Sequence, residues 1–128
     1  MVSRLEALHD SIAALRGWNN PESDCYQLRN PLLLQSFARP GKNEVDAKGR
    51  RVFNSSLAGV RAGLFDLQTK LSGESRANIK LTDNLSNLLR VYGLSEKLAH
   101  QQVVKFLKRA LHDDSITPET PLSYFREQ

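Results

Sequence analysis

The fold class is decided by the stretch SRLEALHDSIAALRGW, residues 3–18. Ser3 and Glu6 have the spacing of a capping box, which satisfies two backbone amides at the start of a helix. Gly17 tolerates the left-handed conformation that ends many helices. Between these signals the apolar residues recur every three or four positions, at Leu5, Leu8, Ile12 and Leu15. The sequence therefore predicts a helix over residues 4–16 with one face in a core.

Three further segments have the same helical period. One begins at Ser55 or Ser56, one leads from Thr82 to a stop at Gly93, and one follows Ser95 as its cap. Their expected core positions are Leu57, Val60, Leu64, Leu67 and Leu71, then Leu85, Leu88, Leu89 and Tyr92, then Val103, Phe106, Leu107, Ala110 and Leu111. A short final helical turn is expected from Thr120-Pro121, because proline suits the first helical position, and it would hold Leu122, Tyr124 and Phe125.

Residues 18–43 are rich in Asn, Pro, Ser and Gly, so they are expected to form a long loop with short turns. Residues 43–53 then place a polar turn ending at Gly49 between Val45 and Val52-Phe53, which predicts a small β-hairpin. The expected fold class is thus mainly α (α+β), with one small β-hairpin between the first and second long helices.

Composition narrows the class of protein but not its function. The 128 residues, 40% hydrophobic and 25% charged, are typical of one globular domain, so residues 1–128 are expected to form a single soluble domain. One cysteine, Cys25, excludes an internal disulfide. No apolar run approaches a membrane span, and the first residues lack the layout of a signal peptide. A cytoplasmic location without membrane association is the default expectation.

The sequence contains no signature of a metal site, of a catalytic nucleophile or of a cofactor site. His9, His100 and His112 lie on separate predicted elements, without a partner at the fourth residue along or a neighbouring cysteine. There is no G-x-S-x-G elbow, and Cys25 stands in no known nucleophile motif. Neither a metal nor a cofactor is expected.

The net charge of +4 suits a polyanionic partner. Six basic residues lie between positions 29 and 51, against Glu44 and Asp46: Arg29, Arg39, Lys42, Lys48, Arg50 and Arg51. The segment after Ser95 adds Lys97, Lys105, Lys108 and Arg109. No recognition-helix or RNP signature accompanies them, so a solvated surface explains these charges more simply than a nucleic-acid or acidic-partner site does.

Several motifs occur together in one order along about residues 8–125. They are Gly17-Trp18, Arg29-Asn30-Pro31, Lys48-Gly49-Arg50-Arg51-Val52-Phe53, Gly59-Val60-Arg61-Ala62, Lys70-Leu71-Ser72-Gly73 and Leu88-Leu89-Arg90-Val91-Tyr92. This order resembles the phage- and prophage-associated lysozyme-like (muramidase or transglycosylase-like) domains whose loop carries an Asn-Asn-Pro-Gly-Asn motif. The resemblance implies a lysozyme-like helical domain acting on peptidoglycan.

The same resemblance implies that the catalytic chemistry is lost. In that family the first helix ends in Glu-Gly-Phe or Glu-Gly-Trp, with the Glu similar to the general acid of a lysozyme site, whereas this chain has Arg16-Gly17-Trp18. An arginine stays protonated near neutrality and cannot deliver a proton. The loop motif is reduced to Asn30-Pro31 followed by two leucines. The expectation is a pseudoenzyme that retains the scaffold.

The sequence leaves open what Trp18 does and whether another acid replaces the missing glutamate. Trp18 can cover the helix end as part of the core, or it can stack on a sugar ring together with Tyr26. A groove for a glycan or a protein partner is expected near Arg16, Trp18, Tyr26, Asn30 and Tyr92. Alternatively, Glu22 or Asp24 replaces the missing acid and the domain is an active muramidase, which requires burial of that carboxylate in an apolar pocket.

Overall fold

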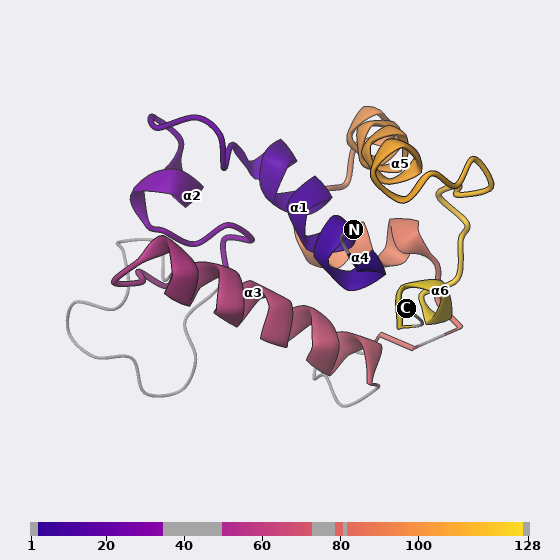
Figure 1. The fold of residues 1–128 in the computed structure, drawn as a ribbon, viewed down its shortest axis with the longest axis horizontal. Helices are drawn as coiled ribbons and strands as arrows, with labels where there is room; N and C mark the ends of the chain where they lie inside the picture. The colour runs from indigo at the N-terminus through magenta and orange to yellow at the C-terminus, as the bar shows by residue number, and fades with distance from the viewer. Residues whose placement is uncertain (1–2, 35–49, 73–78, 81, 127–128) are drawn as a thin grey trace.

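A computed structural model describes residues 3–34, 50–72, 79–80 and 82–126. The regular elements within these ranges are all helices, as Figure 1 shows, so the prediction of a mainly α protein is confirmed. In chain order they are α1 (Arg4–Arg16), α2 (Asp24–Gln27), α3 (Ser56–Leu71), α4 (Leu85–Val91), α5 (Lys97–Leu111) and α6 (Ser123–Arg126). None of these helices has both the length and the apolar character needed to cross a membrane.

Helix α1 is the central element, with α3 on one side of it and α5 on the other (Figure 1). It begins and ends as its sequence predicts. The Ser3 hydroxyl accepts a hydrogen bond from the amide of Glu6 at 3.1 Å, and Gly17 closes the helix with a φ of 96°. Leu8 and Ile12 are fully buried. Burying side chains of this size contributes about 1.5–3 kcal/mol each, so α1 organises the core.

Helix α3 also forms as predicted, but its apolar stripe is buried only toward its end. Ser55 accepts a hydrogen bond from the amide of Ala58 and caps the helix. Leu67 and Leu71 are buried, whereas Leu57 is 59% exposed, which corrects its assignment to the core. The first half of the helix packs against residues 29–32 at small positions, since a Cβ on Gly59 would collide with the Arg29 carbonyl.

Helices α4 and α5 are joined through a histidine. His100, buried on α5, lies 3.0 Å from the Ser86 hydroxyl and 2.5 Å from the Leu94 carbonyl oxygen. The prediction that Ser95 caps α5 is wrong, because the N-cap is Glu96 and it makes no side-chain cap hydrogen bond. Phe106 is 39% exposed rather than part of the core, because it lies beside the buried stripe that faces α1.

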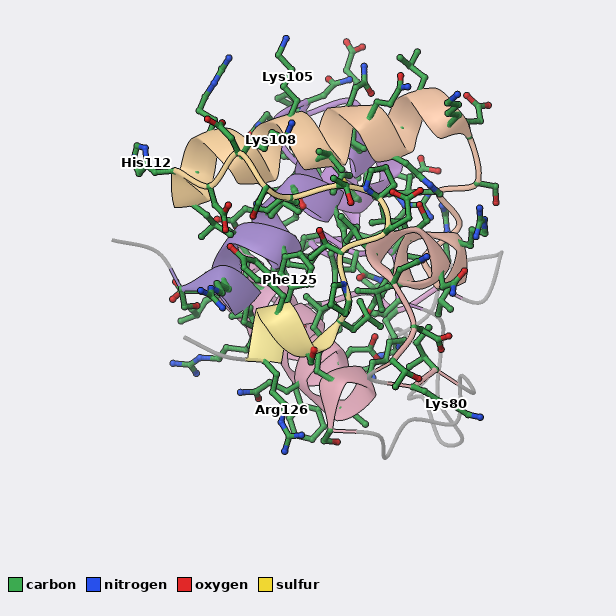
Figure 2. All side chains as sticks on the ribbon, turned by 90° about the vertical axis from the view of Figure 1, so that its right-hand side faces the viewer. Lys80, Lys105, Lys108, His112, Phe125 and Arg126 are labelled. Carbon is green, nitrogen blue, oxygen red and sulfur yellow. The ribbon has the colours of Figure 1, made fainter. Side chains whose placement is uncertain are left out.

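The chain end folds back onto α4 instead of starting a helix at Pro121. Residues Asn84 and Pro121 form an isolated antiparallel bridge, and the Leu122 amide donates to the Asp83 carbonyl at 2.9 Å. The predicted capping role of Thr120 is therefore wrong. Its hydroxyl accepts a hydrogen bond from the Thr117 amide, which precedes it, and α6 begins only at Ser123. Figure 2 shows Phe125 in the interior and the neighbouring Arg126 pointing outward.

The predicted hairpin is not shown. Residues 43–49, which include its turn, lie outside the described residues. The amides of Arg51 and Phe53 donate to the carbonyls of Leu34 and Leu28, at 2.9 and 3.0 Å. These bonds join the described part of the segment to the preceding loop. Arg50 and Arg51 are isolated bridge residues, and no strand forms within the described ranges.

Candidate functional site

A cavity of about 600 Å³ opens between the end of α1, the loop before α3, one face of α3 and the end of α4. Its walls are largely apolar, with a few polar groups among them. The lining residues are Arg16, Leu32, Leu33, Leu34, Arg51, Phe53, Ala62, Phe65, Asp66, Lys70, Val91, Tyr92 and Gly93. Apolar walls with a few polar groups are also typical of small-molecule sites, in which the walls supply contact area and the polar groups fix orientation.

Arg16 is the last residue of α1, and Gly17 turns the chain away directly after it. Its guanidinium lies against the backbone of Gly93, where a Cβ would collide with Nη2. Burial is the main cause that lowers the pKa of Arg16 below its ordinary value. The buried Nε atom makes no hydrogen bond to any residue the structure describes, and no carboxylate in those ranges pairs with this guanidinium.

The cavity also contains a cluster of three polar side chains, in which Lys70 and Tyr92 surround Asp66. One of its carboxylate oxygens accepts hydrogen bonds from the Lys70 ammonium and the Tyr92 hydroxyl, each at 2.5 Å. The Lys70 ammonium also lies 4.8 Å from the centre of the Tyr92 ring. Burial, followed by the Asp66 charge, raises the pKa of Tyr92, so its hydroxyl remains a donor. The cluster therefore ties α3 to the end of α4 and presents a satisfied carboxylate.

The structure brings together only part of the predicted groove. Arg16 and Tyr92 line the cavity, whereas Trp18, Tyr26 and Asn30 do not. Trp18 packs against the core, and its ring centre lies 6.3 Å from that of Tyr26 at an angle of 52°. Tyr26 is 47% exposed. These two aromatic rings form a separate edge of the molecule beside α2.

Asn30 is fully buried behind the cavity wall and acts as a brace. Its Nδ2 donates to the carbonyls of Leu34 and Arg51, both at 3.0 Å, and its Oδ1 accepts from the Leu34 amide at 2.9 Å. The side chain thus joins the loop that supplies three cavity leucines to the segment that precedes α3. It shapes the cavity without reaching into it.

The two candidate acids lie elsewhere. Glu22 is exposed, and neither it nor Asp24 lines the cavity. Asp24 is also exposed and pairs with Arg50 at 3.0 Å. A carboxylate in this setting lacks the apolar surroundings that a glycosidase uses to keep its acid protonated.

Sequence reasoning missed three lining residues that matter to the site, Phe65, Asp66 and Lys70. Asp66 and Lys70 have the spacing of an ion pair on one helical face, which is a visible signal but a common one. Phe65 was not assigned to the expected apolar stripe, and it is 70% exposed at the cavity. Only the fold shows that this face of α3 meets Arg16.

The structure gives no support to a metal site at the histidines, and the basic residues that it describes between positions 29 and 51 have internal contacts. Within the described ranges no group of three or more His, Cys, Asp or Glu side chains is arranged to hold a metal ion. Of the six basic residues between positions 29 and 51, Arg39, Lys42 and Lys48 lie outside the described residues. Arg29 donates to the Asn54 carbonyl at 2.7 Å, and the Arg51 guanidinium stacks 4.9 Å from the centre of the Phe53 ring.

Comparisons with protein-family models, with curated proteins and with solved structures found no match to this chain.

Proposed function

We propose that this protein is a binding domain for a glycan of the peptidoglycan type, and that it lacks glycosidase activity. The observation that carries the proposal is the cavity with Arg16 in its wall. The resemblance to the lysozyme-like domains implies a general acid at this position, and an arginine cannot replace one because it holds its proton near neutral pH.

The one carboxylate among the described lining residues supports the absence of hydrolysis. Asp66 accepts hydrogen bonds from two donors, Lys70 and Tyr92, and is held as an acceptor rather than as a proton donor to a glycosidic oxygen. A glycosidase commonly needs one protonated and one ionised carboxyl group on either side of the scissile bond. The described lining supplies one carboxylate, and that one is an acceptor.

The cavity nevertheless has features that suit a sugar. Apolar side chains such as Leu32 and Phe65 provide surfaces for the carbon face of a pyranose ring and for acetyl methyl groups. Polar groups between them can orient hydroxyl and amide groups of the ligand. A protein partner that inserts a side chain into the same cavity is the other occupant compatible with this lining.

Two measurements on the purified chain test the proposal together. Co-sedimentation with insoluble peptidoglycan measures binding, and chromatography of the supernatant measures release of muropeptides. We expect saturable binding without release. Arg16→Ala should weaken binding, while Arg61→Ala, which removes an exposed arginine of α3 that does not line the cavity, should not.

Each other result has a definite meaning. Absence of binding would refute the glycan proposal. Release of muropeptides that is lost in Glu22→Gln or Asp24→Asn would instead establish the active muramidase, despite the exposure of both side chains.

A second function is favoured by the outer side of α5. This helix carries Lys97, Lys105, Lys108 and Arg109 and no acidic residue, and Figure 2 shows Lys105 projecting away from the fold. Such a surface suits a nucleic acid or another acidic partner. Affinity for duplex DNA should then fall steeply between low and high salt, and K105E/K108E should abolish binding. Retention that does not change with salt would exclude this function.

A further inference from the structure

We infer that the cavity selects a glycan that carries a carboxylate, and that Arg16 binds this carboxylate. The inference rests on the proposed function, since it names a chemical group of the same ligand. It goes further because it gives Arg16 a role of its own. Arg16 is then a specificity-determining residue rather than only the replacement of an acid.

The first reason is that the Arg16 side chain is half-buried, with its Nε atom fully buried, and has no acidic partner in the described part of the chain. A cation that leaves water is normally compensated by an opposite charge or by hydrogen bonds. In the described part of the chain, Arg16 has neither an acidic partner nor a hydrogen bond to its buried Nε. The planar fork of an arginine matches the two oxygens of a carboxylate. A ligand carboxylate would provide the missing compensation.

The second reason is the balance of charge on the cavity walls. Arg16, Arg51 and Lys70 are cations, and Asp66 is the one acid among the lining residues that the structure describes. Lys70 lies 2.5 Å from the Asp66 carboxylate and offsets its charge. The charge of Arg16 remains without counting Arg51, which has contacts of its own, so an anionic ligand is favoured over a neutral one.

The third reason is that the guanidinium packs closely against the backbone of Gly93. Gly93 has a φ of 82°, and any side chain there would collide with the Arg16 guanidinium. The glycine thus leaves the space that the end of the guanidinium occupies beside the chain after α4. A positioned guanidinium loses less side-chain freedom on binding than one that is free in water.

Peptidoglycan offers a carboxylate from two sources, the stem peptide and, on units from which the peptide is absent, the lactyl group of muramic acid, which is otherwise the amide link to the peptide. Three ligands separate these sources in calorimetric titrations. They are N-acetylglucosaminyl-N-acetylmuramic acid without peptide, the same disaccharide with its stem peptide, and neutral chitobiose. Tighter binding of the first than of chitobiose identifies the lactyl carboxylate, and preference for the second alone identifies the peptide.

We expect a carboxylate-bearing ligand to bind about 10- to 100-fold more tightly than chitobiose, the range given by a hydrogen bond to a charged group. Arg16→Gln and Arg16→Ala should each reduce this ratio to near one, and Arg16→Lys should retain part of it. Arg61→Ala should leave the ratio unchanged. Circular dichroism of each variant establishes that it is folded, and the Gln variant keeps the packing if the Ala variant does not.

The outcomes separate the two proposals. If none of the three ligands binds, the proposed function fails and the inference with it. If all three bind with similar affinity, or if the ratio survives Arg16→Gln in a folded protein, the glycan site stands and the selection of a carboxylate by Arg16 is overturned.

Discussion

Replacement of Asn30 by alanine should both destabilise the protein and deform the cavity wall that residues 32–34 form. The side chain is fully buried and makes three hydrogen bonds, two to Leu34 and one to Arg51. Alanine removes both the donor and the acceptor, so the Leu34 amide and the Arg51 carbonyl lose their bonds to this side chain, while the Leu34 carbonyl keeps only its bond from the Arg51 amide. A substitution at this position therefore acts on the loop that carries the cavity leucines.

The magnitude follows from the number of bonds. A hydrogen bond of this kind contributes a net ~1 kcal/mol, so three give a loss of ~3 kcal/mol in the free energy of unfolding. For a domain of this size that loss corresponds to a fall of roughly 10 °C in Tm. The variant N30D keeps the oxygen that accepts from the Leu34 amide, but its second oxygen faces the two carbonyls that Asn30 binds. At neutral pH N30D should therefore be at least as unstable as N30A. At acidic pH, where the new carboxyl is protonated, its loss of stability relative to the wild type should become smaller.

Urea unfolding followed by tryptophan fluorescence measures the effect, because Trp18 is the single tryptophan and packs against the core. The matched control is Asn19→Ala, an exposed asparagine that should change stability by less than about 0.5 kcal/mol. An Asn30→Ala variant with the midpoint and slope of the wild type would refute the account of Asn30 as a brace.

Three further predictions concern other parts of the fold. Gly59→Ala should lower the free energy of unfolding by about 1–3 kcal/mol in urea, because the added methyl collides with a backbone carbonyl; a stabilised variant would contradict this packing. Hydrogen bonds from Ser115 and then Tyr124 lower the pKa of Asp113 to about 2, so their stabilising contribution is present above the unfolded pKa and is lost as the pH falls toward 2. Tyr124→Phe should raise that pKa in an NMR titration, and an unchanged value would show that the tyrosine hydroxyl does not bind the carboxylate. Cys25 is buried, and burial raises the pKa of its thiol, so a thiol reagent should label it only when urea unfolds the chain; rapid labelling of the native protein would contradict its burial.

The local elements were predictable because their signals lie within a few residues of each other. The Ser3 cap, the apolar period and the Gly17 stop fix α1 without help from the rest of the chain. Helix α3 was predicted for the same reason, within a residue of its start. The start of α6 was not, because the segment around Pro121 pairs with Asn84, which is distant in sequence.

Burial was predicted less well than helicity. Leu57 and Phe106 have the right period for a core but lie where no other described element covers them fully. Asn30, a residue typical of exposed turns, is fully buried because backbone groups of the surrounding loop satisfy its amide. Periodicity shows which side chains share a face, but only packing decides how much of that face is covered.

The sequence by itself determined the helical class, the bounds of α1, the start of α3 and the absence of an acid at position 16. The tertiary structure decided what Arg16 faces. It placed the guanidinium over Gly93 and in one cavity with Asp66, Lys70 and Tyr92, and it left Trp18 and Tyr26 outside. The physical reason is that a cavity is made by side chains from α1, α3, α4 and a loop, whose mutual approach depends on core packing and not on any local pattern.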